Sequence, residues 1–264
     1  MKKSKNNYII YTSVIIIVLI LIYIIFFNRT DIISNSKIVK KNTKNNLENL
    51  YCLWTGTNEM SDARKKCLNT LRNTNLNVIL ISESNLSQIV KEPLHEGYKY
   101  LSETHKADYL RCYIMHFYGG SYSDIKHTSK SWLSAIKDLE NSDKWINGFQ
   151  EGAANDVAII KNNSMLTNTL KENYKSLIGT STFICKPNTL LTNEWYTQMI
   201  QLMDANLDNL KKYPSRKPQE VYTPEYPYPF EWTEILGQIF HPLIYKYKDK
   251  VLQTLPKFDN VEYR

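Results

Sequence analysis

The sequence predicts an α/β domain built on a nucleotide-binding sheet and preceded by one transmembrane helix. Two strand-like runs, at 50–54 and 78–82, flank a helix-like segment at 61–73. This strand–helix–strand rhythm is typical of a parallel sheet. A third observation is the uncharged run at 8–27, which is long enough to cross the hydrocarbon core of a bilayer as a helix.

The run at 8–27 predicts an uncleaved signal anchor. A cleaved signal peptide is the alternative, but its apolar region would span only ~7–15 residues and end at small residues. Lysines in the tail at 1–7 favour a cytoplasmic N-terminus, although the span is followed by Arg29, Lys37, Lys40 and Lys41. Residues 28–49 are polar and predict a flexible stem. The folded body would then be 50–264, on the lumenal side of a single-pass type II membrane protein.

Composition narrows the class of protein. A chain of 264 residues with 42% hydrophobic content suits one sizeable domain plus an appendage. The net charge of +7 is scattered, with no basic patch or nucleic-acid-binding module, so we expect no nucleic-acid partner. No glycine-rich phosphate loop supports a dinucleotide or ATP site. The four cysteines lack C-x-x-C spacing, which disfavours zinc and leaves disulfides or buried thiols.

The stretch at 101–132 carries the strongest pattern. Thr104 is the expected N-cap of a helix, and one face of that helix is apolar at 3-4-3 spacing through Ala107, Leu110, Ile114 and Phe117. Gly119 and Gly120 end the helix. A short strand is expected at 121–125. Asp124 therefore falls near a strand end, where α/β proteins place their ligands.

A neighbouring row of the same helix carries Asp108 and Arg111, three residues apart. Two carboxylates and a guanidinium thus come near one another. A carboxylate suits a magnesium or manganese ion bound to a diphosphate, and the other groups suit sugar hydroxyls. The alternative is a buried structural Asp–Arg pair that ties a helix to the sheet.

These motifs carry a resemblance. ADYLR at 107–111 followed by GGSYSD at 119–124 resembles the A-D-x-x-R and G-G-x-Y-x-D core of the DXD-motif glycosyltransferases of the family 32 and capsular-polysaccharide-synthesis type, which the large clostridial glucosylating toxins share. The resemblance implies a GT-A fold, a Rossmann-like mixed sheet flanked by helices. It also implies transfer of a sugar from a nucleotide-diphosphate sugar, here expected to be a UDP-sugar, to a glycan, glycoprotein or glycolipid hydroxyl with retention of configuration.

Roles follow from that resemblance. Asp124 would hold Mn²⁺ or Mg²⁺, Asp108 and Arg111 would orient the donor sugar, and Tyr122 would line the pocket. Trp54, at the end of the first strand, matches a tryptophan that stacks on the nucleobase; a core tryptophan is the alternative. The anchored enzyme would lie in a Golgi or secretory-pathway membrane. A catalytically inactive glycan- or nucleotide-sugar-binding protein on the same fold, or a structural membrane module without ligands, is the alternative function.

One residue departs from the family pattern. Lys126 replaces the second acid, giving Asp124-Ile125-Lys126 in place of Asp-x-Asp. Its ammonium either takes over part of the metal's charge beside the diphosphate, with a catalytic role, or marks a degenerate site. Farther along, His241 is a candidate metal ligand and Glu234 a candidate catalytic acid. A structural histidine and a helix-surface acid are the alternatives.

Overall fold

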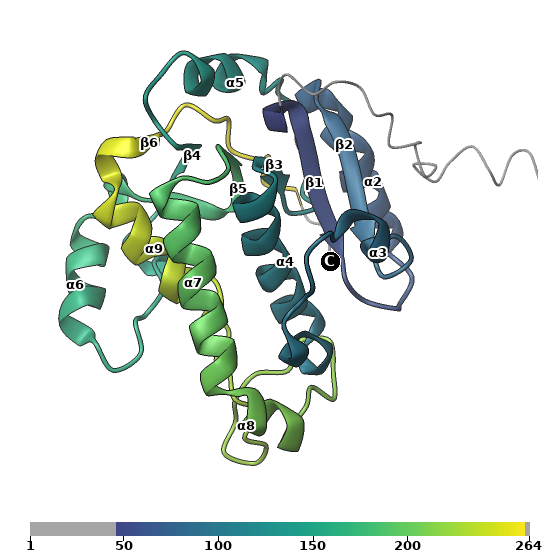
Figure 1. Cartoon of the computed structure of the whole chain (residues 1–264). Helices are drawn as coiled ribbons and strands as arrows, with labels where there is room; N and C mark the ends of the chain where they lie inside the picture. The colour runs from purple at the N-terminus through teal and green to yellow at the C-terminus, as the bar shows by residue number, and fades with distance from the viewer. Residues whose placement is uncertain (1–45, 262–264) are drawn as a thin grey trace, which may run out of the picture. The chain divides into compact units, whose positions relative to one another are not determined.

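The computed structural model in Figure 1 describes residues 46–261. The predicted anchor at 8–27 and nearly all of the predicted stem lie outside these residues. Within the described part of the chain, no helix is both long and apolar enough to cross a membrane.

Six strands of the described chain form one sheet in the order β2-β1-β3-β5-β4-β6. β1 runs parallel to β2 and β3, whereas β5 runs antiparallel to β3 and β4, and β6 is parallel to β4. The sheet is therefore mixed, as the resemblance implied. The strands are β1 (Asn49–Trp54), β2 (Asn77–Ser82), β3 (Gly120–Ser123), β4 (Ile146–Gln150), β5 (Ile178–Cys185) and β6 (Val251–Leu252).

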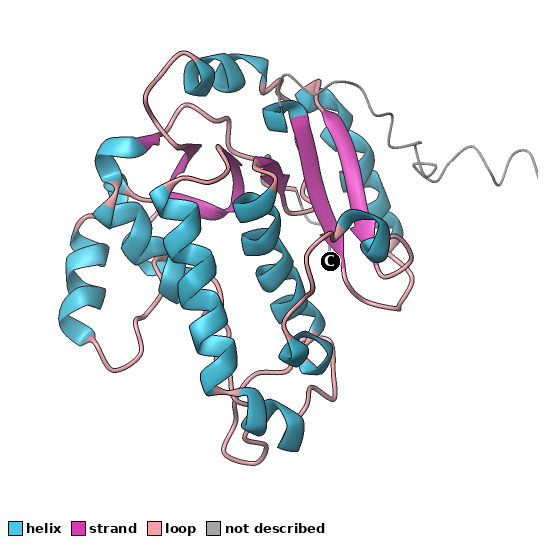
Figure 2. Cartoon of the chain, in the orientation of Figure 1, coloured by secondary structure: helices cyan, strands magenta, loops and turns pink. Residues whose placement is uncertain are grey.

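Helices α4, α7 and α9 form a packed row. α4 contacts β3 and α7, and α7 contacts α9, which reaches β5; Figure 2 shows the three side by side below the strands. The helices are α2 (Asp62–Thr70), α3 (Leu86–Ile89), α4 (Glu103–Phe117), α5 (Leu133–Glu140), α6 (Ser164–Glu172), α7 (Leu190–Ala205), α8 (Leu207–Lys212) and α9 (Gly237–Lys246). Short 3₁₀ turns join several of them, at Asn46–Glu48, Leu71–Thr74, Glu96–Tyr100, Ala154–Asp156, Tyr174–Ser176 and Lys248–Lys250.

α4 is the central helix and is buried on nearly every side. Its N-cap is Ser102, whose hydroxyl accepts from the His105 N–H, so the helix begins earlier than the predicted Thr104 cap. The buried set extends beyond the predicted face to Tyr109, Tyr113 and Met115. The reason is that α7 covers the side of α4 that the sheet leaves open.

The glycine pair after α4 is required by its backbone. Gly119 has φ +62° and Gly120 has φ +113°, both in the region that side chains avoid. A Cβ on Gly119 would lie 2.8 Å from the Cys185 carbonyl oxygen, and one on Gly120 would lie 3.0 Å from that of Asn49. The pair therefore turns the chain directly from α4 into β3, which sets where Asp124 emerges.

Several other local features follow from the chain. Pro93 lies in the loop that separates α3 from the 3₁₀ turn at Glu96–Tyr100. α7 and α8 are separate helices that follow β5 closely in the chain. All four cysteines are buried free thiols.

Candidate functional site

A cleft of about 360 Å³ opens at the carboxyl end of β1 and β3, beside the first turns of α4. Six residues singled out from the sequence line it: Trp54, Asp108, Arg111, Tyr122, Asp124 and Lys126. The volume falls within the usual range for small-molecule sites. The cleft is therefore large enough to be a binding site, and its polar groups converge from three elements.

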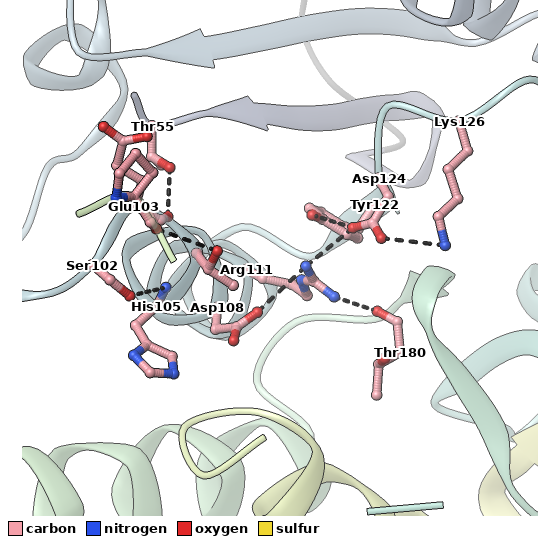
Figure 3. Close-up of polar contacts among 12 residues, drawn as sticks. Thr55, Ser102, Glu103, His105, Asp108, Arg111, Tyr122, Asp124, Lys126 and Thr180 are labelled. Carbon is pink, nitrogen blue, oxygen red and sulfur yellow. Dashed lines mark hydrogen bonds and ion pairs between the residues drawn. The ribbon is translucent and has the colours of Figure 1, made fainter. Parts of the chain in front are cut away.

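Asp124 follows β3 directly and contacts Tyr122, Arg111 and Lys126 in the polar network shown in Figure 3. Its backbone N–H donates to the Ser181 carbonyl at 2.8 Å, which fixes the turn against β5. Its Oδ1 accepts from the Tyr122 hydroxyl at 2.9 Å and from Arg111 Nη2 at 3.1 Å. The side chain remains 30% exposed, so the carboxylate still faces the cleft.

Arg111 connects α4 to β5 and to the residue that follows β3. Its Nη1 donates to the Thr180 carbonyl on β5, and its Nη2 lies 3.5 Å from Asp108 Oδ1. The guanidinium also lies over the Tyr122 ring, 4.2 Å from the centroid. These contacts fix the plane of the guanidinium and tie α4 to the sheet, as the structural interpretation of an Asp–Arg pair expected.

Burial raises the pKa of two groups in the network. The pKa of Asp108 is raised to about 7, chiefly by burial and in part by the nearby Asp124 charge, while Arg111 lowers it. The pKa of Tyr122 is raised well above its ordinary value by burial. Tyr122 therefore stays protonated and donates to Asp124, whereas Asp108 changes charge near neutral pH.

Lys126 occupies the side of Asp124 that faces away from Arg111. Its ammonium lies 3.6 Å from Asp124 Oδ2 and 4.0 Å from the centroid of the Phe258 ring. Figure 3 shows the side chain directed at the carboxylate. Both carboxylate oxygens thus already face cationic or hydroxyl donors.

The groups around Asp124 decide whether it can bind the divalent metal expected from the resemblance. A divalent ion on Asp124 Oδ2 would share that oxygen with an ammonium ion of like charge. Residues 46–261 contain no cluster of three or more His, Cys, Asp or Glu side chains arranged to hold a metal. The residues present do not fit Mn²⁺ or Mg²⁺ at Asp124.

One end of the cleft is formed by β1 and the loop after it. The Trp54 indole N–H donates to the Asn58 carbonyl at 2.9 Å, which fixes the ring at the cleft wall. Thr55 donates to the Glu103 carbonyl at 2.6 Å and holds this loop on α4. Arg64, on α2, also lines the cleft and donates to the Ile125 carbonyl at 2.7 Å.

The loop between α8 and α9 supplies the remaining wall, which local sequence patterns did not reveal. Three residues of this loop line the cleft: Pro218, Gln219 and Trp232. Trp232 is 50% exposed. The Pro218 carbonyl accepts from the Thr104 N–H at 3.2 Å, which joins the loop to the start of α4. The only hint in the sequence was the length of this proline- and tyrosine-rich loop.

A set of buried hydrogen bonds fixes the same loop from inside the domain. The Tyr228 hydroxyl accepts from the Ser102 N–H at 3.1 Å and lies 2.9 Å from His105 Nδ1, while His105 Nε2 lies 3.1 Å from the Glu231 carbonyl. Burial lowers the pKa of His105 to about 4, so the ring is neutral at ordinary pH. Neutral His105 donates from Nε2 to Glu231 and accepts from Tyr228, and Trp232 is the next residue along the chain.

Two predicted site residues lie outside the cleft. His241 Nδ1 accepts from the Ala158 N–H at 3.1 Å, and its Nε2 lies 3.3 Å from Glu151 Oε1. Glu234 pairs with Lys161 at 3.1 Å and accepts from the Glu231 N–H at 2.9 Å. The structure therefore corrects both expectations: His241 is not beside Asp124 as a metal ligand, and Glu234 is not placed for catalysis in the cleft.

Comparisons with known proteins agree with the motif. Residues 24–130 match the family model described as capsular polysaccharide synthesis protein, which is less than half of the chain. No curated protein matches. A solved structure titled PaToxG Glycosyltransferase is similar at 16% identity and a TM-score of 0.43, covering 76% of this chain and 69% of that one, a likeness too distant to carry an inference. The matched stretch contains the helix, the glycine pair and Asp124, so the chain is similar to this family over the part that holds the motif.

Proposed function

We propose that this protein transfers a sugar from a UDP-sugar to a hydroxyl of a glycan, glycoprotein or glycolipid, with retention of configuration. The observation that carries the proposal is the convergence of Trp54, Asp108, Arg111 and Asp124 on one cleft. An aromatic ring at one end suits a nucleobase, and carboxylates beside a guanidinium suit sugar hydroxyls.

The groups divide the donor between them. Trp54 stacks on the base, and the pyrophosphate lies toward the cations beyond it. Asp108 and Arg111 hold the sugar, because a carboxylate accepts and a guanidinium donates in fixed directions. Tyr122 and Asp124 keep Arg111 in place through the contacts described above. Such fixed groups favour reaction because their orientation is set before the substrate arrives.

We also propose that segment 8–27 anchors the enzyme, with the body in the lumen of a secretory-pathway compartment such as the Golgi. The support is the length of the uncharged run and the lysines before it. A membrane-embedded acceptor, such as a glycolipid, would then lie in the same membrane as the anchor.

The test uses the full-length chain in detergent and a panel of UDP-glucose, UDP-galactose, UDP-N-acetylglucosamine and GDP-mannose. We expect saturable binding of at least one donor, release of its nucleoside diphosphate, and an α-linked product if configuration is retained. Trp54→Ala should weaken nucleotide binding about tenfold, the usual scale of base stacking. Trp145→Ala is the matched control, because Trp145 lies against Tyr247 and does not line the cleft.

The outcomes separate the alternatives. Binding of a nucleotide sugar without any turnover would favour the inactive binding protein on the same fold. No binding of any nucleotide or nucleotide sugar, or equal losses in the two tryptophan variants, would overturn the proposal.

A further inference from the structure

Lys126 occupies the position at which the resemblance predicts a metal-binding acid. Its backbone N–H donates to the Asp124 carbonyl at 2.8 Å, so the turn itself holds the side chain next to Asp124. The side chain is only 16% exposed, and its ammonium lies at the cleft wall. The lysine is therefore a fixed part of the site and differs in this from the solvated lysines of the surface.

The aromatic ring beside Lys126 is held by the C-terminal segment. Asp259 accepts from His127 Nδ1 at 2.9 Å and from the Ser129 hydroxyl at 3.1 Å, and its N–H donates to the His127 carbonyl at 2.8 Å. These three bonds fix the segment against the turn that carries Lys126. Phe258 is the adjacent residue, and its ring lies under the ammonium. An aromatic face attracts a cation without using any of its N–H donors.

The ammonium therefore keeps most of its hydrogen-bonding capacity. An ammonium ion has three N–H donors, and the contact with Asp124 Oδ2 uses at most one of them. Arg111 differs, because both of its Nη atoms already contact Asp108, Asp124 or Thr180, and its Nε is buried. Of these two cations at the bottom of the cleft, Lys126 is the more accessible to an incoming anion, with a side chain 16% exposed against 7% for Arg111.

We propose that Lys126 binds the pyrophosphate of the nucleotide sugar in place of a divalent metal ion. This rests on the proposed function and specifies the chemistry of the same site. Two observations support this proposal. The surroundings of Asp124 do not suit a divalent ion, and Lys126 keeps N–H donors for an anion. One substitution at the motif would thus exchange a metal-dependent site for a metal-independent one.

The transfer step balances with this lysine. The bond between the anomeric carbon and the β-phosphate oxygen breaks, and its electron pair stays on that oxygen. The acceptor hydroxyl oxygen forms the new bond to the anomeric carbon, and its proton passes to solvent. Lys126 donates hydrogen bonds to the oxygen that gains charge and keeps its own proton, so it stabilises the leaving group electrostatically.

The test measures binding of UDP and of inorganic pyrophosphate to the full-length chain by calorimetry, in EDTA and in MnCl₂, with turnover of UDP-glucose as a second readout. Inorganic pyrophosphate is included because it reports on the lysine whatever base the donor carries. We expect the wild-type affinities and rate in EDTA to stay within about twofold of those in MnCl₂.

Three variants make the test specific. Lys126→Met keeps an apolar side chain against Phe258 and removes the charge. It should weaken the binding of both ligands at least tenfold, and Mn²⁺ should not restore it. Lys126→Asp creates Asp-x-Asp and should bind poorly in EDTA but recover at least fivefold in MnCl₂. Lys130→Ala removes an exposed lysine that does not line the cleft, and it should leave the affinity for both ligands unchanged.

Two results would overturn the inference while leaving the proposed function intact: wild-type binding that collapses in EDTA and returns with Mn²⁺, or wild-type affinity in Lys126→Met. If the wild type binds neither ligand in either buffer, the proposed function fails, and this inference fails with it.

Discussion

Two clusters of ionisable side chains can be compared within this domain. The cleft cluster consists of Asp108, Arg111, Asp124 and Lys126, and the second cluster, which does not line the cleft, consists of the two ion pairs Lys161–Glu234 and Glu151–His241. Both contain carboxylates next to cationic or imidazole nitrogens at 3.1–3.6 Å. Their residue chemistry is therefore similar, and composition alone does not distinguish them.

The difference lies in what each cluster faces. Asp124 keeps 30% of its side chain exposed at the cleft, whereas Glu234 keeps 10% and His241 2%, and neither lines the cleft. Glu234 and His241 also bond to backbone N–H groups of neighbouring loops. A paired carboxylate inside the fold mainly fixes loops, while the same pairing at the wall of a cleft leaves an oriented charge for a ligand.

The largest expected effect separates the two clusters directly. Asp124→Asn should lower kcat/KM by about 10²–10³-fold, because the amide no longer balances Arg111 and Lys126 and their orientation is lost. Glu234→Gln is the matched control, since it removes the charge of a carboxylate that also pairs with a lysine. We expect its kcat/KM to stay within about twofold while its melting temperature falls. Similar losses of activity in both variants would contradict the division into two clusters.

A medium effect comes from the titration of Asp108 inside the cleft cluster. Its folded-state pKa of about 7 lies above the ordinary value of 3.8. Between these two values the folded chain binds the extra proton and the unfolded chain does not, so this group makes stability fall as pH rises from about 4 to 7. Affinity for the donor sugar should move the opposite way and rise several-fold between pH 6 and 8, because the carboxylate accepts stronger hydrogen bonds.

Asp108→Asn tests both trends together. It should flatten the slope of stability against pH in urea titrations and remove the rise in UDP-glucose affinity. UDP-glucose is the better ligand here, because it lacks the terminal phosphate proton with which UDP itself would titrate. An unchanged pH dependence of both quantities in the variant would show that Asp108 does not carry them.

The sequence was most informative where the deciding contacts are local. Strand β1, helix α4 and the turn at Gly119 and Gly120 were expected within a few residues of their places, because hydrophobic period and glycine conformation act over short separations. The position of Asp124 followed from them, since a residue just after a strand of an α/β sheet meets the ligand edge. The fold class and the main residues of the cleft were therefore predictable.

Distant partners decided the rest. His241 has a residue type that suits a metal, but its ring meets Glu151 and Ala158, which no local pattern places beside it. The loop after α8 reaches the cleft because Tyr228 and Glu231 bond to His105, more than a hundred positions earlier in the chain. Long-range pairings of this kind decide which polar residues face the cavity, and periodicity contains no information about them.

The smallest expected effect concerns the loop after α8, where one aromatic residue lines the cleft and another does not. Trp232 and Tyr222 lie on the same loop with similar exposure, 50% and 52%, but only Trp232 lines the cleft. If the cleft surface decides function, Trp232→Ala should raise the KM for the acceptor roughly fivefold, about 1 kcal/mol of lost stacking on a sugar face. Tyr222→Ala should leave it unchanged.

Affinity for UDP measured in the same two variants assigns the Trp232 ring to one substrate. An unchanged UDP affinity in Trp232→Ala would place the ring on the acceptor side, in line with the proposal that Trp54 binds the base. A loss of UDP affinity equal to the loss in acceptor KM would instead make Trp232 part of the donor site. Equal effects in the two variants would show that exposure on the loop, and not the wall of the cleft, decides the contribution of an aromatic ring.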